Sequence, residues 1–141
     1  MDLHIDDFYK DAAKGLLMLY QAFPNKSTLY MDDLIGYMAP DEFGLPRDRQ
    51  QRCLSTFIWL AEEGYLRYQS TIRFEALDQI ELREKSFLRL SKAIAPLPSV
   101  LETAPPSVRR AQGSLANQLR EALQSEHSER VIELMQLFFM R

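Results

Sequence analysis

The sequence has few of the residues from which catalytic and metal centres are built. It contains one cysteine, Cys53, and two histidines, His4 and His127, in a chain of 141 residues. A single cysteine excludes an internal disulfide framework, and neither histidine has a carboxylate or cysteine partner at metal-ligand spacing. A glycine-rich phosphate loop is also missing. We therefore expect no enzyme, no metal site and no cofactor.

Long apolar runs are absent as well. Stretches such as LLMLY and LFFM are much shorter than the ~20 residues that cross a bilayer. The acidic start, MDLHIDD, lacks the basic and apolar regions of a secretory signal. Hydrophobic residues make up 46% of the chain, which is enough for a packed core. These features predict a cytoplasmic, bacterial-type protein with no membrane segment.

The charge is unevenly distributed. The chain has a net charge of −3, which argues against a strongly basic binder of any nucleic acid. Residues 1–43 hold three basic against eight acidic side chains, whereas residues 44–92 hold nine against seven. Residues 93–141 hold five of each. Positive charge is therefore concentrated in the middle of the chain.

Hydrophobic periodicity and turn residues predict a mainly helical chain with a small sheet. Apolar side chains recur every three or four positions from Phe8 to Phe23, which predicts a helix that Pro24 stops. An extended piece at 27–31 should follow, and then a short helix begun by Asp32 and Asp33 and closed by Pro40. The next helix should run from Pro46 to Glu63, stopped by Gly64. Strands within 65–70 and 76–82, joined by a polar loop at 71–75, and a helix at 83–94 complete the elements expected before residue 95.

This order of elements, and the segment TFIWLAEEGYLRYQSTIRFEALDQIELREKSFLRLS, resemble bacterial winged-helix transcription regulators of the MarR or PadR kind. The segment matches the end of a recognition helix followed by a wing, with EEGYL at residues 62–66 as the junction. Arg83 and Ser86 stand where a threonine and a glycine would be expected. The resemblance covers residues 5–94 and implies a winged helix-turn-helix domain at 1–94.

The helix from Pro46 would then be the recognition helix that enters the major groove. Counting ~100° per residue places Leu54, Phe57, Ile58 and Ala61 on the core side, and Arg52, Thr56 and Trp59 opposite. The residues expected to contact double-stranded DNA are Arg47, Arg49, Gln51, Arg52, Ser55 and Thr56 in the helix and Arg67 and Arg73 in the wing. An ordinary solvated helix face is the alternative interpretation of this stripe. Cys53, in the same helix, is expected to pack as a small hydrophobe; the resemblance adds a redox-sensing thiol as the alternative.

Residues 95–112 contain four prolines and are expected to form a linker, followed by a C-terminal helical segment at 113–141. That segment should hold helices at 113–124 and 128–140, the second capped by Ser128. Its last helix is apolar on more than one side, so it must fold back on the chain or meet its twin in a dimer. The residues expected at a dimer or partner contact are Trp59, Leu134, Met135, Phe138 and Phe139.

Two functions follow from these expectations. The first is a winged-helix DNA-binding protein, a bacterial transcriptional regulator that acts as a dimer. The second is a winged-helix protein-interaction module, a subunit of a larger complex without DNA binding, because a fold alone does not settle function.

Overall fold

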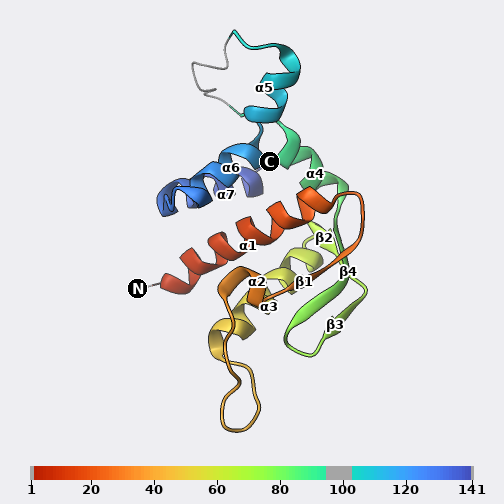
Figure 1. Cartoon of the computed structure of the whole chain (residues 1–141), viewed down its shortest axis with the longest axis vertical. Coiled ribbons are helices and arrows are strands. Elements are labelled where there is room, and N and C mark those ends of the chain that lie inside the picture. Colours follow the sequence, from red (N-terminus) through yellow and green to blue (C-terminus); the bar gives the residue numbers. More distant parts are fainter. Residues whose placement is uncertain (1, 95–102, 141) are drawn as a thin grey trace. The chain divides into compact units, whose positions relative to one another are not determined.

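The computed structural model describes residues 2–94 and 103–140. These residues form seven helices and four strands, in two compact units, Met1–Arg83 and Glu84–Arg141 (Figure 1). The expected class, mainly helical with a small antiparallel sheet, is confirmed. The helix expected to close the first domain at residue 94 begins the second unit instead.

The first unit has three helices, α1 (Leu3–Ala22), α2 (Asp32–Ile35) and α3 (Asp48–Glu62). The predicted helix at 32–38 is shorter than expected, because Gly36 leaves the helical conformation with a φ of 83°. The third helix begins two residues after Pro46, and Gly64, with a φ of 82°, follows its end as expected. A loop of residues 36–47 therefore separates α2 from α3.

The sheet of the first unit is built around β4 (Ala76–Leu82), which pairs antiparallel with all three other strands. One edge is β1 (Ser27–Tyr30), in register with Ile80 to Ala76. The other edge is shared by β2 (Leu66–Arg67) and β3 (Ser70–Ile72). The order along the main path is β1-β4-β2, as Figure 1 shows.

The predicted loop at 71–75 is a tight hairpin turn instead. Thr71 and Ile72 belong to β3 and pair with Leu77 and Ala76 of β4. The turn closes with a hydrogen bond of 3.0 Å from the Glu75 N–H to the Ile72 carbonyl. Arg73 sits in this turn with a φ of 50°, so its side chain stands at the tip of the hairpin.

The core of the first unit lies where α1 meets α3 and β4. Leu16, Phe57, Leu77 and Ile80 are completely buried there. The Phe57 ring rests on the backbone of α1 at Gly15, where any added Cβ would overlap the ring. The missing side chain at position 15 therefore sets how closely the two helices approach.

We predict that Gly15→Ala destabilises the chain by about 1–3 kcal/mol, because the new methyl group must displace a buried ring. Alanine would otherwise stabilise a helix by up to about 1 kcal/mol relative to glycine, so the sign of the change identifies the steric effect. Urea denaturation would measure it. The double variant Gly15→Ala, Phe57→Leu should recover part of the loss, and an increase in stability for Gly15→Ala alone would contradict the packing described.

The second unit contains α4 (Glu84–Ser91), α5 (Pro106–Gln112), α6 (Leu115–Gln124) and α7 (Ser128–Met140). The predicted helices at 113–124 and 128–140 are confirmed, and they pack against each other, with α4 against α6. The Leu115 N–H donates to the Lys92 carbonyl, and the Ile94 N–H donates to the Gly113 carbonyl. These two hydrogen bonds join the residues after α4 to the start of α6.

Two expectations about this unit need correction. The predicted linker at 95–112 is wrong for its last part, because Pro106 begins α5; residues 95–102 lie outside the described residues. Ser128 is also not the N-cap of α7. The cap is His127, whose Nδ1 accepts a hydrogen bond of 3.1 Å from the Arg130 N–H.

Candidate functional site

Arg49, predicted to face DNA, is held by carboxylates of α1. Its guanidinium donates two hydrogen bonds of 2.6 Å to the two oxygens of Asp11, and its Nε lies 3.6 Å from an oxygen of Asp7. Asp11 is almost completely buried. The hydrogen bond with Asp11 raises the pKa of Arg49, because it favours the charged guanidinium. Reading a base with Arg49 would therefore leave a buried carboxylate unpaired.

Three other polar side chains at or beside the front of α3, those of Arg47, Gln51 and Arg52, also have partners within the chain. The Arg52 Nε is 2.8 Å from a carboxylate oxygen of Asp48, one helical turn earlier. The Arg47 Nε donates to the Ala39 carbonyl at 3.1 Å. The Gln51 amide donates to the carbonyl of Pro46 at 2.9 Å. The Gln51 hydrogen bond joins the end of the 36–47 loop to the first turn of α3.

Ser55 and Thr56 line the same groove but differ in exposure. Ser55 is exposed, as expected. The prediction that Thr56 faces outward is wrong, because Thr56 is buried and its Oγ1 donates to the Arg52 carbonyl at 3.0 Å. Leu54 and Phe57 are buried as expected, together with Gln50, Cys53 and Leu60. Ile58 and Ala61, which were also expected in the core, are half-buried. The prediction from ~100° per residue therefore placed the centre of the buried side about one residue too close to the C-terminal end of α3.

The two arginines expected in a wing have different environments. Arg67 lies 2.7 Å from a carboxylate oxygen of Glu81, its cross-strand neighbour on β4. Arg73 is exposed at the tip of the hairpin and makes no ion pair with any described residue. Of the eight residues expected to contact DNA, Ser55 and Arg73 are the exposed ones whose side chains no described residue holds.

Trp59 lies beside aromatic rings of its own unit. The Phe8 ring meets it edge-on with centroids 5.5 Å apart, and the Tyr65 ring stacks on it at 6.5 Å. Trp59 and Phe8 also line an apolar groove of about 440 Å³ between α1 and α3, together with Ile5 and Tyr9. The indole is part of this groove wall and remains partly exposed.

The C-terminal residues expected at a dimer contact are mostly interior. Leu134, Met135 and Phe138 are completely buried, and Phe139 is half-buried. The Arg89 guanidinium of α4 donates to the Phe138 carbonyl at 3.0 Å and lies 5.9 Å from the centre of that ring. A partner could not reach the first three of these side chains without unfolding α7 from its unit.

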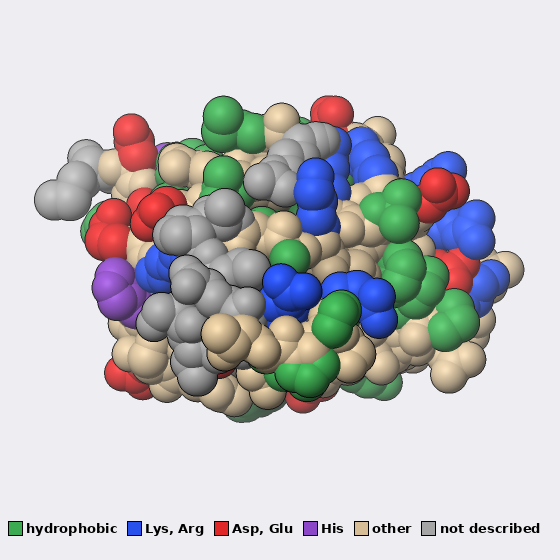
Figure 2. Space-filling model, turned by 90° about the horizontal axis from the view of Figure 1, so that it is seen from above, with side chains coloured by type: hydrophobic (Ala, Val, Ile, Leu, Met, Phe, Trp, Pro, Cys, Tyr) green, Lys and Arg blue, Asp and Glu red, His purple; other side chains and the backbone are tan. Residues whose placement is uncertain are grey.

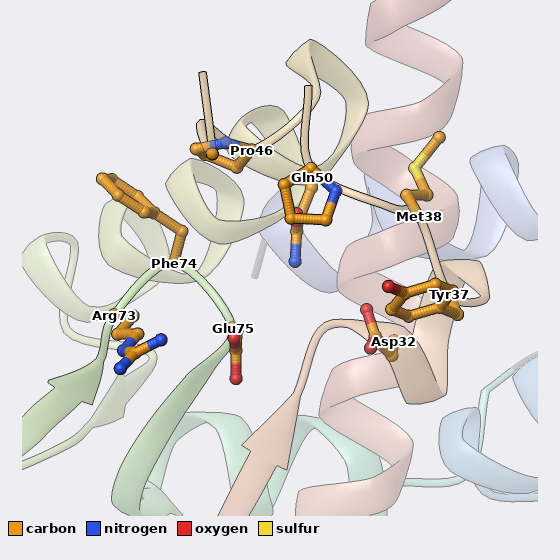
Figure 3. A pocket seen from close by; sticks show the side chains of 10 residues that line it. Asp32, Tyr37, Met38, Pro46, Gln50, Arg73, Phe74 and Glu75 are labelled. Atoms are coloured by element: carbon orange, nitrogen blue, oxygen red, sulfur yellow. The ribbon is translucent and has the colours of Figure 1, made fainter. Parts of the chain in front are cut away.

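A cavity that sequence reasoning missed lies between the 36–47 loop and the β3–β4 turn. We call it the loop cavity; its volume is about 180 Å³. Five polar side chains line it, from α2, the loop, α3 and the turn: Asp32, Tyr37, Gln50, Arg73 and Glu75 (Figure 3). Apolar walls come from Met38, Pro40, Pro46 and Phe74.

Large, exposed apolar side chains line the loop cavity or neighbour its lining residues in sequence. Tyr37 is 77% exposed and Phe74 is 50% exposed, and both line the cavity. Phe43, 79% exposed, and Leu45, 53% exposed, flank Gly44, which lines it too. We call these four residues the loop–hairpin face. Bulky apolar groups in a proline- and glycine-rich turn were the available sequence signal for it.

No protein-family model, curated protein or solved structure matches this chain. The chemistry must therefore be argued from its own geometry. In the part of the chain that the structure describes, no three His, Cys, Asp or Glu side chains are grouped so that they could hold a metal ion. Within the same residues, no helix combines the length and apolar character needed to span a bilayer.

Cys53 is completely buried beside the Asp11–Arg49 pair. Burial, followed by the negative charge of Asp11, raises the pKa of the Cys53 thiol to about 12. The thiol therefore stays protonated at neutral pH, where only the thiolate would react. This environment favours the expected packing role over a redox sensor.

We predict that Cys53 reacts with a thiol reagent such as DTNB only as fast as the chain unfolds at pH 7.5. The rate should rise steeply in urea and become that of an exposed cysteine above the unfolding midpoint. Reaction within seconds in native buffer would show an accessible thiolate and would revive the redox hypothesis.

We also predict that Arg49→Ala costs about 3–5 kcal/mol of unfolding free energy, because it leaves Asp11 charged, buried and unpaired. The matched control is Arg52→Ala, which removes an exposed pair and should cost less than about 1 kcal/mol. Replacing both partners, as Asp11→Leu with Arg49→Met, should restore most of the loss. Equal, small effects of Arg49→Ala and Arg52→Ala in urea denaturation would argue that the pair is not structural.

Proposed function

We propose that the first unit is a winged helix that serves as a protein-interaction module and docks on a partner protein through the loop–hairpin face. The order of elements supports the winged helix: three helices with a strand after the first, then a hairpin. The strand order β1-β4-β2 supports it too, since the first strand lies beside the last one and the hairpin forms the wing.

The pairing of the arginines argues for a protein partner over DNA. Arg49, Arg52 and Arg67 are each neutralised by a carboxylate of this chain at 2.6–2.8 Å. A DNA-binding surface normally presents such groups to phosphates. Figure 2 shows a different face, the one seen from the top of Figure 1, and there too Lys and Arg side chains lie among hydrophobic, acidic and uncharged groups.

The observation that carries the proposal is the loop–hairpin face itself. Four large apolar side chains, three of them aromatic, are half to four-fifths exposed; two of them line the loop cavity, and the other two flank Gly44, which lines it. Aromatic anchors around a pocket are typical of the centre of a protein interface. Exposing them otherwise gains nothing for the fold, because apolar groups lower the free energy when they leave water.

We predict that the full chain, carrying the photoreactive residue p-benzoylphenylalanine at position 43 or 74, crosslinks to one protein in its native cells. The matched control position is Gln21, an exposed residue of α1 outside the loop–hairpin face. The double substitution Tyr37→Ser, Phe43→Ser should abolish co-purification of that protein while the fold persists. Crosslinking at position 21 as strong as at position 43, or none at 43 and 74, would overturn the proposal.

Binding of double-stranded DNA, as a dimeric bacterial transcriptional regulator, is the second candidate. Exposed Arg73 at the tip of the hairpin favours it, because a wing places its turn near the DNA backbone. Fluorescence anisotropy with mixed duplex DNA at 50 and 200 mM salt decides between the two. The protein-partner proposal expects no binding at either salt concentration, whereas an affinity that falls steeply with salt and with Arg73→Ala would establish the second candidate.

A further inference from the structure

The polar side chains that line the loop cavity have no partners, unlike Arg49, Gln51 and Arg52 of α3. Asp32, Tyr37, Gln50, Arg73 and Glu75 form no side-chain hydrogen bond or ion pair with any described residue. Buried polar groups in folded proteins are normally satisfied. Tyr37, Arg73 and Glu75 are exposed to water, but Gln50 and one oxygen of Asp32 are buried at the same cavity, and convergent polar groups of this kind are typical of a ligand site.

Two of these groups are buried as well as unpartnered. Gln50, in the first turn of α3, is only 6% exposed, and its amide points into the cavity in Figure 3. The Oδ1 of Asp32 is fully buried and accepts no hydrogen bond. Asp32 as a residue is only half-buried, so its carboxylate stays a hydrogen-bond acceptor with one oxygen lacking a donor, and it favours a positively charged group beside it.

The charged side chains that line the cavity are also negative on balance. Asp32 and Glu75 oppose one lining cation, Arg73, which lies on the Glu75 side, across from Asp32 and Tyr37, in the view of Figure 3. Nearby in sequence, α2 adds the carboxylate of Asp33, and the loop adds those of Asp41 and Glu42 against the cation of Arg47. Tyr37 and Phe74 bring aromatic rings, whose faces also attract cations.

We infer that the loop cavity binds the terminal cation of an arginine or lysine side chain of the partner protein. This inference rests on the proposed function and assigns the partner's anchor residue. A cavity of about 180 Å³ holds one side chain and no larger ligand. Asp32 and, with the amide turned over from the orientation in Figure 3, the Gln50 carbonyl oxygen would accept the hydrogen bonds of the cation, while the loop–hairpin face packs on the apolar surface around it.

The test uses the ¹⁵N-labelled full chain and three short peptides, acetyl-Gly-X-Gly-amide, with arginine, lysine or citrulline as X. Citrulline keeps the shape of arginine but is neutral. The arginine and lysine peptides should shift the Gln50 side-chain amide signal and the backbone signals of residues 32–46 and 73–75 in NMR spectra, at millimolar concentration and more weakly at high salt. Equal shifts with citrulline, or no shift with any peptide at 20 mM, would overturn the inference.

Asp32→Asn and Gln50→Leu should each weaken peptide binding by tenfold or more. The matched control is Asp33→Asn, next to Asp32 but exposed and outside the lining, which should leave binding within about twofold. The amide spectrum of each variant reports whether it is folded. A partner that still crosslinks at position 43 and binds Asp32→Asn with unchanged affinity would refute the inference while leaving the proposed function intact. Peptide binding without any crosslinked protein would refute the partner as the source of the cation.

Discussion

The Asp11–Arg49 ion pair is the constraint around which the first unit is organised. It joins the middle of α1 to the front of α3 with two hydrogen bonds, and it lies next to the buried thiol of Cys53. A charge pair in such a position holds a geometry more than it adds stability, because desolvation offsets much of the attraction. What it holds here is the register of α3 on α1, the same register that places Phe57 against Gly15.

That constraint also decides which polar groups remain for binding. With α3 fixed by Arg49, and with Arg52 and Arg67 on carboxylates of their own chain, the helix front becomes part of the scaffold. The polar side chains without a partner gather in the loop cavity, around Asp32 and Gln50. The difference between polar groups with and without partners therefore supports the proposed binding surface more directly than the number of arginines does.

The second unit shows the same principle with apolar groups. The last helix is too hydrophobic to be stable alone, and the sequence allows either a dimer or a partner within the chain. Leu134, Met135 and Phe138 are buried within the chain, α7 packs against α6, and Arg89 holds the end of the helix through the Phe138 carbonyl. Burial of these side chains removes the main reason to expect dimerisation through this helix.

The sequence by itself determined the mainly helical class, most helices and strands, and the stops at Pro24 and Gly64, because local periodicity and backbone preferences carry that information. It also allowed the packing role of Cys53 to be favoured. Only the tertiary structure decided which arginines are neutralised, because Asp11 and Arg49 are 38 residues apart. The loop cavity was equally out of reach: α2, the loop, α3 and the hairpin each contribute a few side chains, and no local pattern records that they converge. Ion pairing and cavity formation depend on long-range contacts, which a residue's neighbours in sequence do not specify.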